Sequence, residues 1–306
     1  MAPGDGQWRG YPKMCSAQRR DERRETPCGA SVEHESGGSA QGGRLYADAG
    51  NTALKWAVRA EGAWIAEGRL PIDALTGEAR RASEEMAQAL TAEGIFPENL
   101  AGTALVCSRL SDVAEIERAL QDAIGTRIAL LGRDLDAGIA TTYEDPAQIG
   151  QDRLALAEGA VEMVGAPVIA IALGTCITAQ WIDADAVMTG GAIAAGIAAQ
   201  VKGIGQAVPH LSNAVMQAAE LLRQDHEMIA ARQSTVGSLA RGLAASVRGT
   251  VEALLERARG EVGDVPVIAT GGDAALAKHL GAPFSHVEDL LVLEGLRVAD
   301  ERSRER

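Results

Sequence analysis

The stretch "RLYADAGNTALKW" (residues 44–56) places a polar corner directly after an apolar run. The run ends at Asp48, and Gly50, Asn51 and Thr52 follow before the apolar pattern resumes. Asp, Gly and Asn are the common residues of tight turns, so this corner could be an ordinary hairpin turn. It could equally hold an anion, because such a turn presents backbone N–H groups and a hydroxyl group to phosphate oxygens.

The pattern on both sides of the corner predicts an α/β domain. Short alternating runs predict three strands, and Glu61 and Gly62 form the turn between the second and the third. Helices and strands alternate from there on, which is typical of α/β folds. The expected strands are 44–50, 54–60, 63–71, 103–110 and 127–132, and the expected helices are 78–94 and 112–125.

The opening pattern recurs about 125 residues later, which indicates an internal duplication of the architecture. A helix is expected over Gln151–Val164, and residues 167–196 then repeat the order of strand, Gly-Thr turn, strand, turn and strand. Later segments predict two helical regions, a strand at 265–272, a helix at 273–281 and a charged terminal helix. Between them a long amphipathic helix is expected, with an apolar stripe of Val236, Leu239, Leu243, Val247, Val251 and Leu254.

Three parts of the chain are therefore expected. Residues 1–43 are rich in Gly, Ser, Arg and Glu without apolar periodicity, which indicates a disordered extension or the product of an upstream start site. Residues 44–166 and 167–306 are expected to form the two duplicated domains.

Composition excludes several classes of protein. The chain of 306 residues is 46% hydrophobic, which allows substantial cores, and we find no apolar run long enough to cross a membrane. The first residues lack the apolar core of a secretory signal, so we expect a cytoplasmic protein. Its net charge of −13 disfavours nucleic acid as a partner. Four scattered cysteines (Cys15, Cys28, Cys107 and Cys176) indicate reduced thiols and no structural metal.

The two corners suggest phosphate chemistry. Asp48 can hold a phosphate-bound Mg²⁺, and Lys55 supplies a compact positive charge in a chain that has few lysines. The sequence "LGT" (173–175) repeats the corner in the second half. Elsewhere, Asp152 and Arg153 place a proton acceptor beside a cation that can bind a carboxylate. The alternative for Asp152 is a purely structural place in the first turn of a helix.

Taken together, four segments resemble the type III pantothenate kinases, which belong to the actin/hexokinase/heat-shock-protein superfamily. They resemble, in chain order, the family's D-x-G-N-T-x-x-K phosphate motif, its substrate motif, its second phosphate motif with the following glycine turn, and its adenosine-side turn. The segments are "DAGNTALK" (48–55), "YEDPAQIGQDR" (143–153), "LGTCIT" (173–178) with "GGAIAAG" (190–196), and "VIATGGDA" (267–274). The resemblance covers about residues 44–300.

This resemblance implies a fold, a reaction and partners. The fold is α/β, with two duplicated ribonuclease-H-like (actin-like ATPase) domains and a nucleotide cleft between them. The reaction is transfer of the γ-phosphoryl group of ATP to the primary hydroxyl of pantothenate, which gives 4′-phosphopantothenate in the first step of coenzyme A synthesis. It also implies ATP with Mg²⁺, activation by K⁺ or NH₄⁺, and a homodimer.

The family's site residues carry over by position, with Asp152 as the general base that accepts the hydroxyl proton. Those that contact ATP and its Mg²⁺ are Asp48, Gly50, Asn51, Thr52, Lys55, Gly174, Thr175 and Asp183. Those that bind pantothenate are Tyr143, Gly150, Gln151, Asp152, Arg153 and Thr235.

The second phosphate motif departs from the family pattern. Ala172 stands where an acid is expected, and Gln180 replaces the acid that helps to bind the monovalent cation. Ala195 stands near an expected proline. A glutamine still offers a carbonyl oxygen to K⁺, but without the charge, so we expect a weakened cation site and a requirement for high KCl.

Two alternatives to a pantothenate kinase stay open. One is a kinase of the same fold for another small hydroxyl substrate, such as a sugar, although a sugar lacks the carboxylate that Arg153 would meet. The other is a non-catalytic or regulatory nucleotide-binding relative, for which Ala172 and Gln180 are the only support.

Overall fold

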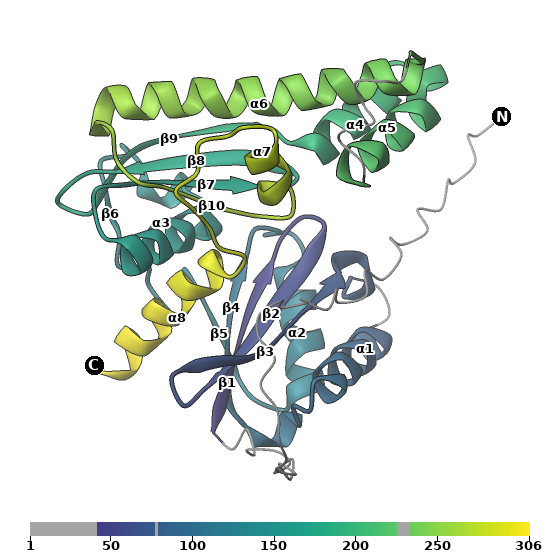
Figure 1. Ribbon diagram of the computed structural model, residues 1–306. Coiled ribbons are helices and arrows are strands. Elements are labelled where there is room, and N and C mark those ends of the chain that lie inside the picture. Colours follow the sequence, from purple (N-terminus) through teal and green to yellow (C-terminus); the bar gives the residue numbers. More distant parts are fainter. Residues whose placement is uncertain (1–41, 77–78, 225–232) are drawn as a thin grey trace, which may run out of the picture.

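The computed structural model describes most of the chain. Its described residues form two β-sheets, with helices packed against each sheet (Figure 1). Nearly all of the expected extension, residues 1–41, lies outside the described residues, as do Cys15 and Cys28. None of the described helices is long and apolar enough to cross a membrane. The described residues are 42–76, 79–224 and 233–306.

The first sheet has the strand order β3-β2-β1-β4-β5 and confirms the predicted meander. Its first three strands pair antiparallel, and Glu61 and Gly62 turn between the second and third, both with positive φ. The helices α1 (Ala79–Ala92) and α2 (Val113–Ile124) supply apolar side chains to the core on one face. The strands are β1 (Gly43–Ala49), β2 (Ala53–Ala60), β3 (Ala63–Pro71), β4 (Leu100–Cys107) and β5 (Ile128–Leu130).

The second sheet repeats this meander and has the order β11-β10-β7-β8-β9-β6. The antiparallel pairs of β7 with β8 and of β8 with β9 correspond to the first three strands, so the predicted duplication is confirmed. Two edge strands of two residues each were not predicted. The strands are β6 (Ala140–Thr141), β7 (Val168–Leu173), β8 (Cys176–Ile182), β9 (Val187–Ala195), β10 (Val267–Thr270) and β11 (His286–Val287).

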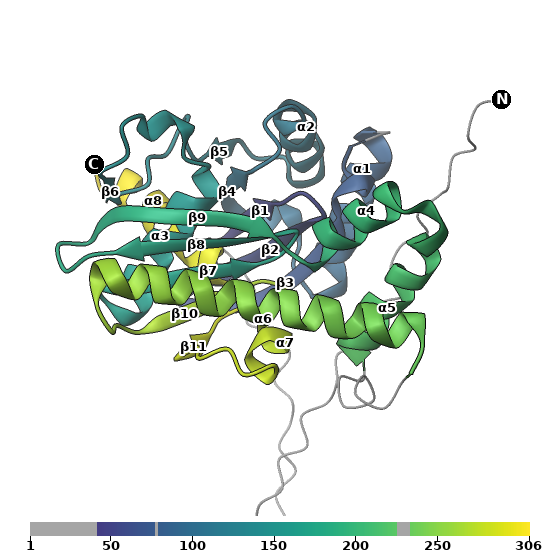
Figure 2. The ribbon, with the colours of Figure 1, turned by 90° about the horizontal axis from the view of Figure 1, so that it is seen from above.

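Helix α6 (Thr235–Val262) runs along the outer face of the second sheet (Figure 2). Leu243, Val247 and Val251 of the predicted stripe are buried against it. The buried stripe continues through Leu255 and Ala258, whereas the predicted Leu254 is only partly buried. The remaining helices here are α4 (Ile197–Ala207), α5 (Ser212–Gln224) and α7 (Ala274–His279). Short 3₁₀ turns lie at Ile72–Ala74, Pro97–Asn99, Pro146–Gln148 and Pro209–Leu211.

Between the two sheets, α3 (Gln151–Val164) crosses α8 (Leu291–Arg304). Glycines make this crossing close: a Cβ atom on Gly295 would lie 1.8 Å from the carbonyl oxygen of Ala155, and one on Gly159 would lie 2.1 Å from that of Leu291. The helix pair therefore packs backbone against backbone.

The two crossed helices also exchange sheets. Helix α3 packs its apolar side chains on the second sheet, and α8 packs Leu293 and Leu296 on the first. Division of the chain into domains between residues 166 and 167 stays a prediction. The packing crosses that point, because β6 and α3 precede it but belong with the second sheet, whereas α8 follows it but packs on the first.

An ion pair fixes α8 to β1. The guanidinium of Arg44 donates to both oxygens of Asp300, at 2.8 Å and 2.7 Å, and the Tyr46 hydroxyl donates to the same carboxylate at 3.1 Å. Asp300 is buried, so this pair is shielded from water. Burial, reinforced by Asp300, raises the pKa of Tyr46 to about 12.

Candidate active site

The corner after β1 is closed by its own backbone. The N–H of Gly50 donates to the carbonyl of Ala53 at 3.1 Å, and Asp48 pairs with Lys55 across β1 and β2. Directly paired residues point to the same face of a sheet, so the carboxylate and the ammonium are neighbours there. Burial raises the pKa of Asp48 to about 6; Lys55 acts against this shift and Asp152 adds to it.

The corner after β7 has the same construction and meets the first one. Here the N–H of Gly174 donates to the carbonyl of Cys176 at 2.9 Å. The hydroxyl groups of Thr52 and Thr175, one from each corner, lie 2.8 Å apart. Two turns that the sequence predicted separately therefore form one polar site between the sheets.

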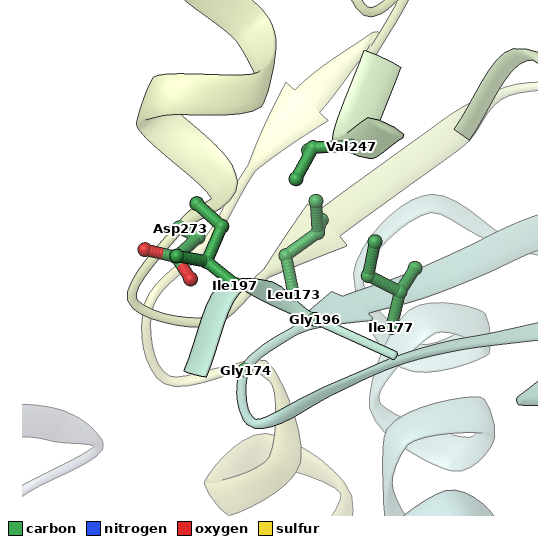
Figure 3. A pocket seen from close by; sticks show the side chains of 7 residues that line it. All are labelled: Leu173, Gly174, Ile177, Gly196, Ile197, Val247 and Asp273. Atoms are coloured by element: carbon green, nitrogen blue, oxygen red, sulfur yellow. The ribbon is translucent and has the colours of Figure 1, made fainter. Parts of the chain in front are cut away.

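Neighbouring turns hold the second corner in place (Figure 3). The N–H of Gly196 donates to Thr175 at 3.0 Å, and the N–H of Asp273 donates to Leu173 at 3.1 Å. Gly271, in the turn after β10, has a φ of +101°, and a Cβ atom there would lie 2.3 Å from the Leu173 oxygen. The turns after β7, β9 and β10 therefore pack together.

Helix α3 brings Asp152 to the first corner. This residue lies in the first turn of the helix, which begins after Gly150. Burial raises the pKa of Asp152, while hydrogen bonds to its own and the following backbone N–H act against the shift. The charge of Asp152 contributes to the raised pKa of Asp48, so the two carboxylates lie within electrostatic range of each other. A carboxylate so placed can accept a proton, and two that repel one another suit a divalent cation.

Next to Asp152, Arg153 is buried against an aromatic ring. Its Nη2 atom donates to the hydroxyl of Tyr143 at 2.9 Å, and its guanidinium lies 5.6 Å from the centre of that ring. A Cβ atom on Gly191 would lie 2.6 Å from the same nitrogen, so Arg153 and Tyr143 lie against strand β9. Among the described residues, the buried Nε atom of Arg153 has no hydrogen-bond partner.

Gln180 lies on the same face of the second sheet, because it pairs with Gly191 across β8 and β9. Its side chain is completely buried, and neither its oxygen nor its nitrogen has a partner in the described parts of the chain. Gln180 and Arg153 therefore both leave buried polar atoms without partners next to Gly191 of β9. Such atoms cost free energy unless a ligand or water satisfies them, so they mark a place for a polar ligand.

Comparisons with known proteins show which family the chain resembles. The model of the type III pantothenate kinase family matches residues 44–257, which is more than half of the chain. The chain belongs to that family. A type III pantothenate kinase of Roseiflexus sp. strain RS-1 is 30% identical over 265 residues, which cover 85% of this chain and 99% of that relative.

Two further relatives carry the same name. That of Acidiphilium cryptum is 29% identical over 260 residues, which cover 83% of this chain and 93% of the relative. That of Thermomicrobium roseum is 40% identical over 168 residues, which cover 55% of this chain and 62% of the relative.

Solved structures support the fold at lower identity. Component A of (R)-2-hydroxyglutaryl-CoA dehydratase from Acidaminococcus fermentans superimposes with a TM-score of 0.51 at 16% identity and covers 86% of this chain and 99% of its own. This structural match, together with the two duplicated sheets, confirms the predicted actin-like α/β fold.

Several residues expected at the site lie elsewhere in this pantothenate kinase family member. Asp183 lies at the far end of β8 from Thr175, and its carboxylate accepts the N–H groups of Asp185 and Val187, both at 3.0 Å. That carboxylate closes the turn between β8 and β9. It is not brought to the phosphate corners.

Two expected substrate residues also lie apart from Asp152. Thr235 is the first residue of α6 and lines a separate pocket of about 380 Å³ with Gln200 and Leu239. The side chain of Gln151 lies against Gly132, in the turn after β5. The structure therefore gathers Asp48, Thr52, Lys55, Thr175 and the 150–153 segment, but not these two side chains.

Two arginines beside the first corner were not predicted. Arg109 donates to the carbonyl of Asn51 at 3.3 Å, and Arg69 is close enough to Asp48 to act against the rise in its pKa. Counting back from the turn at Glu61 and Gly62 would align Lys55 with Gly68. A β-bulge between Val58 and Arg59 shifts the register by one residue, so Lys55 pairs with Arg69 instead, which turn counting alone does not predict.

Proposed function

We propose that this chain transfers the γ-phosphoryl group of ATP to the primary hydroxyl of pantothenate and so forms 4′-phosphopantothenate. Membership of the type III pantothenate kinase family supports the reaction. The observation that carries the proposal is the meeting of the two corners through Thr52 and Thr175, with Asp152 near enough to Asp48 to raise its pKa. A triphosphate and an alcohol would therefore meet where a base is available.

The two corners are suited to the phosphate chain. The hydroxyl groups of Thr52 and Thr175 can donate to phosphate oxygens, as can the backbone of both corners, and Lys55 adds a positive charge. Asp48 would hold the Mg²⁺ that accompanies ATP. Its carboxylate suits the ion, because a divalent cation would offset the repulsion between Asp48 and Asp152. The ion supplies neutralisation of the charge on the phosphates.

The acceptor alcohol would lie between Asp152 and the phosphate corners. Asp152 accepts the proton of the pantothenate hydroxyl group while the hydroxyl oxygen bonds to the γ-phosphorus. The bond between that phosphorus and the oxygen bridging to the β-phosphate breaks, which releases ADP. Arg153, held on Tyr143, can bind the carboxylate of pantothenate through nitrogen atoms not used in that contact. A substrate with both a hydroxyl and a carboxylate fits this pair.

The monovalent cation, the homodimer and the cytoplasmic location also belong to this proposal. Gln180 can offer one buried carbonyl oxygen to K⁺ or NH₄⁺, and Ala172 beside it offers no side-chain ligand. Such a site has no charge of its own, so it would bind the cation weakly. Thr235 and Asp183 keep their proposed ligand contacts only if substrate binding changes the arrangement described above.

An assay of ADP release with ATP and pantothenate tests the function. We expect turnover in the wild type, and a fall in kcat of roughly 10²- to 10⁴-fold in Asp152→Asn, with nucleotide binding retained. Asp122→Asn, an exposed acid on α2, is the matched control and should keep full activity. Turnover with a sugar alone would replace the substrate, and nucleotide binding without any turnover would favour a non-catalytic relative.

A further inference from the structure

Arg69 extends the charged row that begins at Asp48. The register pairs Asp48 with Lys55 and Lys55 with Arg69, so the three side chains occupy one face of three neighbouring strands. Neighbouring strands lie about 4.8 Å apart, which puts the backbone of Arg69 roughly 10 Å from that of Asp48. An arginine side chain can span most of that distance, and Arg69 does influence the charge state of Asp48.

The other end of this side chain reaches the opposite half of the molecule. A Cβ atom on Gly272 would lie 3.6 Å from Nη1 of Arg69. Gly272 belongs to the turn after β10, and Asp273 of that turn donates its N–H to Leu173 at the end of β7. The guanidinium therefore lies between the first phosphate corner and a turn that adjoins the second.

This cation is also available to a ligand. Arg69 is exposed, and no hydrogen bond or ion pair joins it to another residue of the described ranges. The nearest acid of the Gly272 turn, Asp273, is occupied by Arg223, whose Nε atom donates to it at 3.0 Å. An exposed guanidinium with its donors free, beside the first phosphate corner and the β10–α7 turn, matches the geometry of phosphate oxygens.

We propose that Arg69 binds the α- and β-phosphate oxygens of the nucleotide and so joins the edge strand β3 to the β10–α7 turn. The position supports this part of the nucleotide, because Arg69 lies two strands from Asp48 and next to the β10–α7 turn, whereas the γ-phosphate would lie toward Asp152 in the proposed reaction. Arg69 is then a second phosphate cation beside Lys55. This inference rests on the proposed kinase function.

Calorimetric titration of the full-length chain with ADP and with adenosine tests the proposal. In Arg69→Gln we expect the affinity for ADP to fall roughly 10- to 100-fold, the usual range for loss of a charged hydrogen bond, while adenosine binds as in the wild type. The KM for ATP should rise with that for pantothenate unchanged. Arg69→Lys keeps the charge without the fork and should lose less.

The matched control is Arg81→Gln, which removes an exposed arginine that pairs with Glu85 on α1. It should change ADP affinity less than twofold. Wild-type affinity for ADP in Arg69→Gln would overturn the proposal, as would an equal loss for adenosine, because that pattern indicates a structural role.

A measurement on the wild type covers the case in which Arg69→Gln does not fold. Phenylglyoxal modifies accessible guanidinium groups, and mass spectrometry of the peptides reports each site. We expect ADP, but not adenosine, to protect Arg69, whereas Arg81 reacts at the same rate in both. Equal modification of Arg69 with and without ADP would overturn the proposal.

Failure of the inference is distinguishable from failure of the proposed function. Wild-type turnover of pantothenate with unchanged ADP binding in Arg69→Gln overturns only the role of Arg69. Loss of ADP binding in that variant, from a wild type that turns over no pantothenate, supports the role of Arg69 and contradicts the kinase function.

Discussion

Replacement of Gly295 by alanine tests the crossing of α3 and α8. The new Cβ atom would lie 1.8 Å from the carbonyl oxygen of Ala155, whereas ordinary contact begins at 3.4 Å. The two helices would have to separate by roughly 1.6 Å, because both partners of the clash are helix backbone and neither can rotate away.

Two opposing effects set the expected magnitude. Alanine is favoured over glycine inside a helix by about 1 kcal/mol. Overpacking of a close contact costs about 1–3 kcal/mol, and a backbone clash belongs at the upper end of that range. The clash exceeds the helix preference, so Gly295→Ala should lower the free energy of unfolding by about 2 kcal/mol. Activity should also fall, because Ala155 lies one turn after Asp152 and a shift of about 1 Å at a reacting group can cost 10²-fold.

Urea unfolding followed by circular dichroism measures the stability change, and the ADP-release assay measures activity. The control is Gly249→Ala in α6, where a Cβ atom would meet nothing within 4 Å. The same substitution there should stabilise the protein by about 0.5–1 kcal/mol and leave turnover unchanged. If Gly295→Ala proved as stable as the wild type while Gly249→Ala behaved as expected, the close crossing would be refuted.

Three further outcomes are expected. Arg44→Met should lower the free energy of unfolding in urea by about 3 kcal/mol, because it leaves the buried Asp300 without its main partner. Adding Asp300→Leu should restore part of the loss, and wild-type stability of Arg44→Met would contradict this. Turnover should fall as the pH drops through about 6, where Asp48 takes up a proton. The pKa of Asp48 in the folded protein lies above the unfolded value of 3.8, so its ionisation lowers the stability of the fold as the pH rises from about 4 to 6. Asp48→Asn should therefore be more stable than the wild type at pH 7, and an unchanged urea midpoint would refute this. Activity should rise with KCl from millimolar to molar concentration if Gln180 forms a weak cation site, and a flat response would exclude it.

Local patterns made much of this fold predictable. The meanders, both corners and the start of α3 each depend on residues within a few positions, so turn and periodicity signals were sufficient to place them. The edge strands β6 and β11 were missed because two residues carry no alternation. The long helix buries Leu255 rather than Leu254 because both positions fit helical spacing after Val251, and the packing against the sheet selects between them.

The site depended more on distant contacts. That Thr52 would touch Thr175 follows from how the two sheets are set against each other, which no short segment encodes. The position of Asp183 was open to a simple check. Thr175 and Asp183 flank the seven residues of β8, and a strand rises about 3.3 Å per residue, so the two residues lie roughly 26 Å apart along the strand. Arg69 faces Lys55 only because of the β-bulge between Val58 and Arg59, and the turn residues do not encode that bulge.

The exchange of helices between the sheets has a consequence for biosynthesis. Domains usually begin to fold as they leave the ribosome, in the order in which they are made. Here one face of the earlier sheet is covered by Leu293 and Leu296, which are translated only after the entire later sheet. The nascent protein must therefore carry an uncovered apolar surface through most of its synthesis, and the two halves mature together rather than in turn.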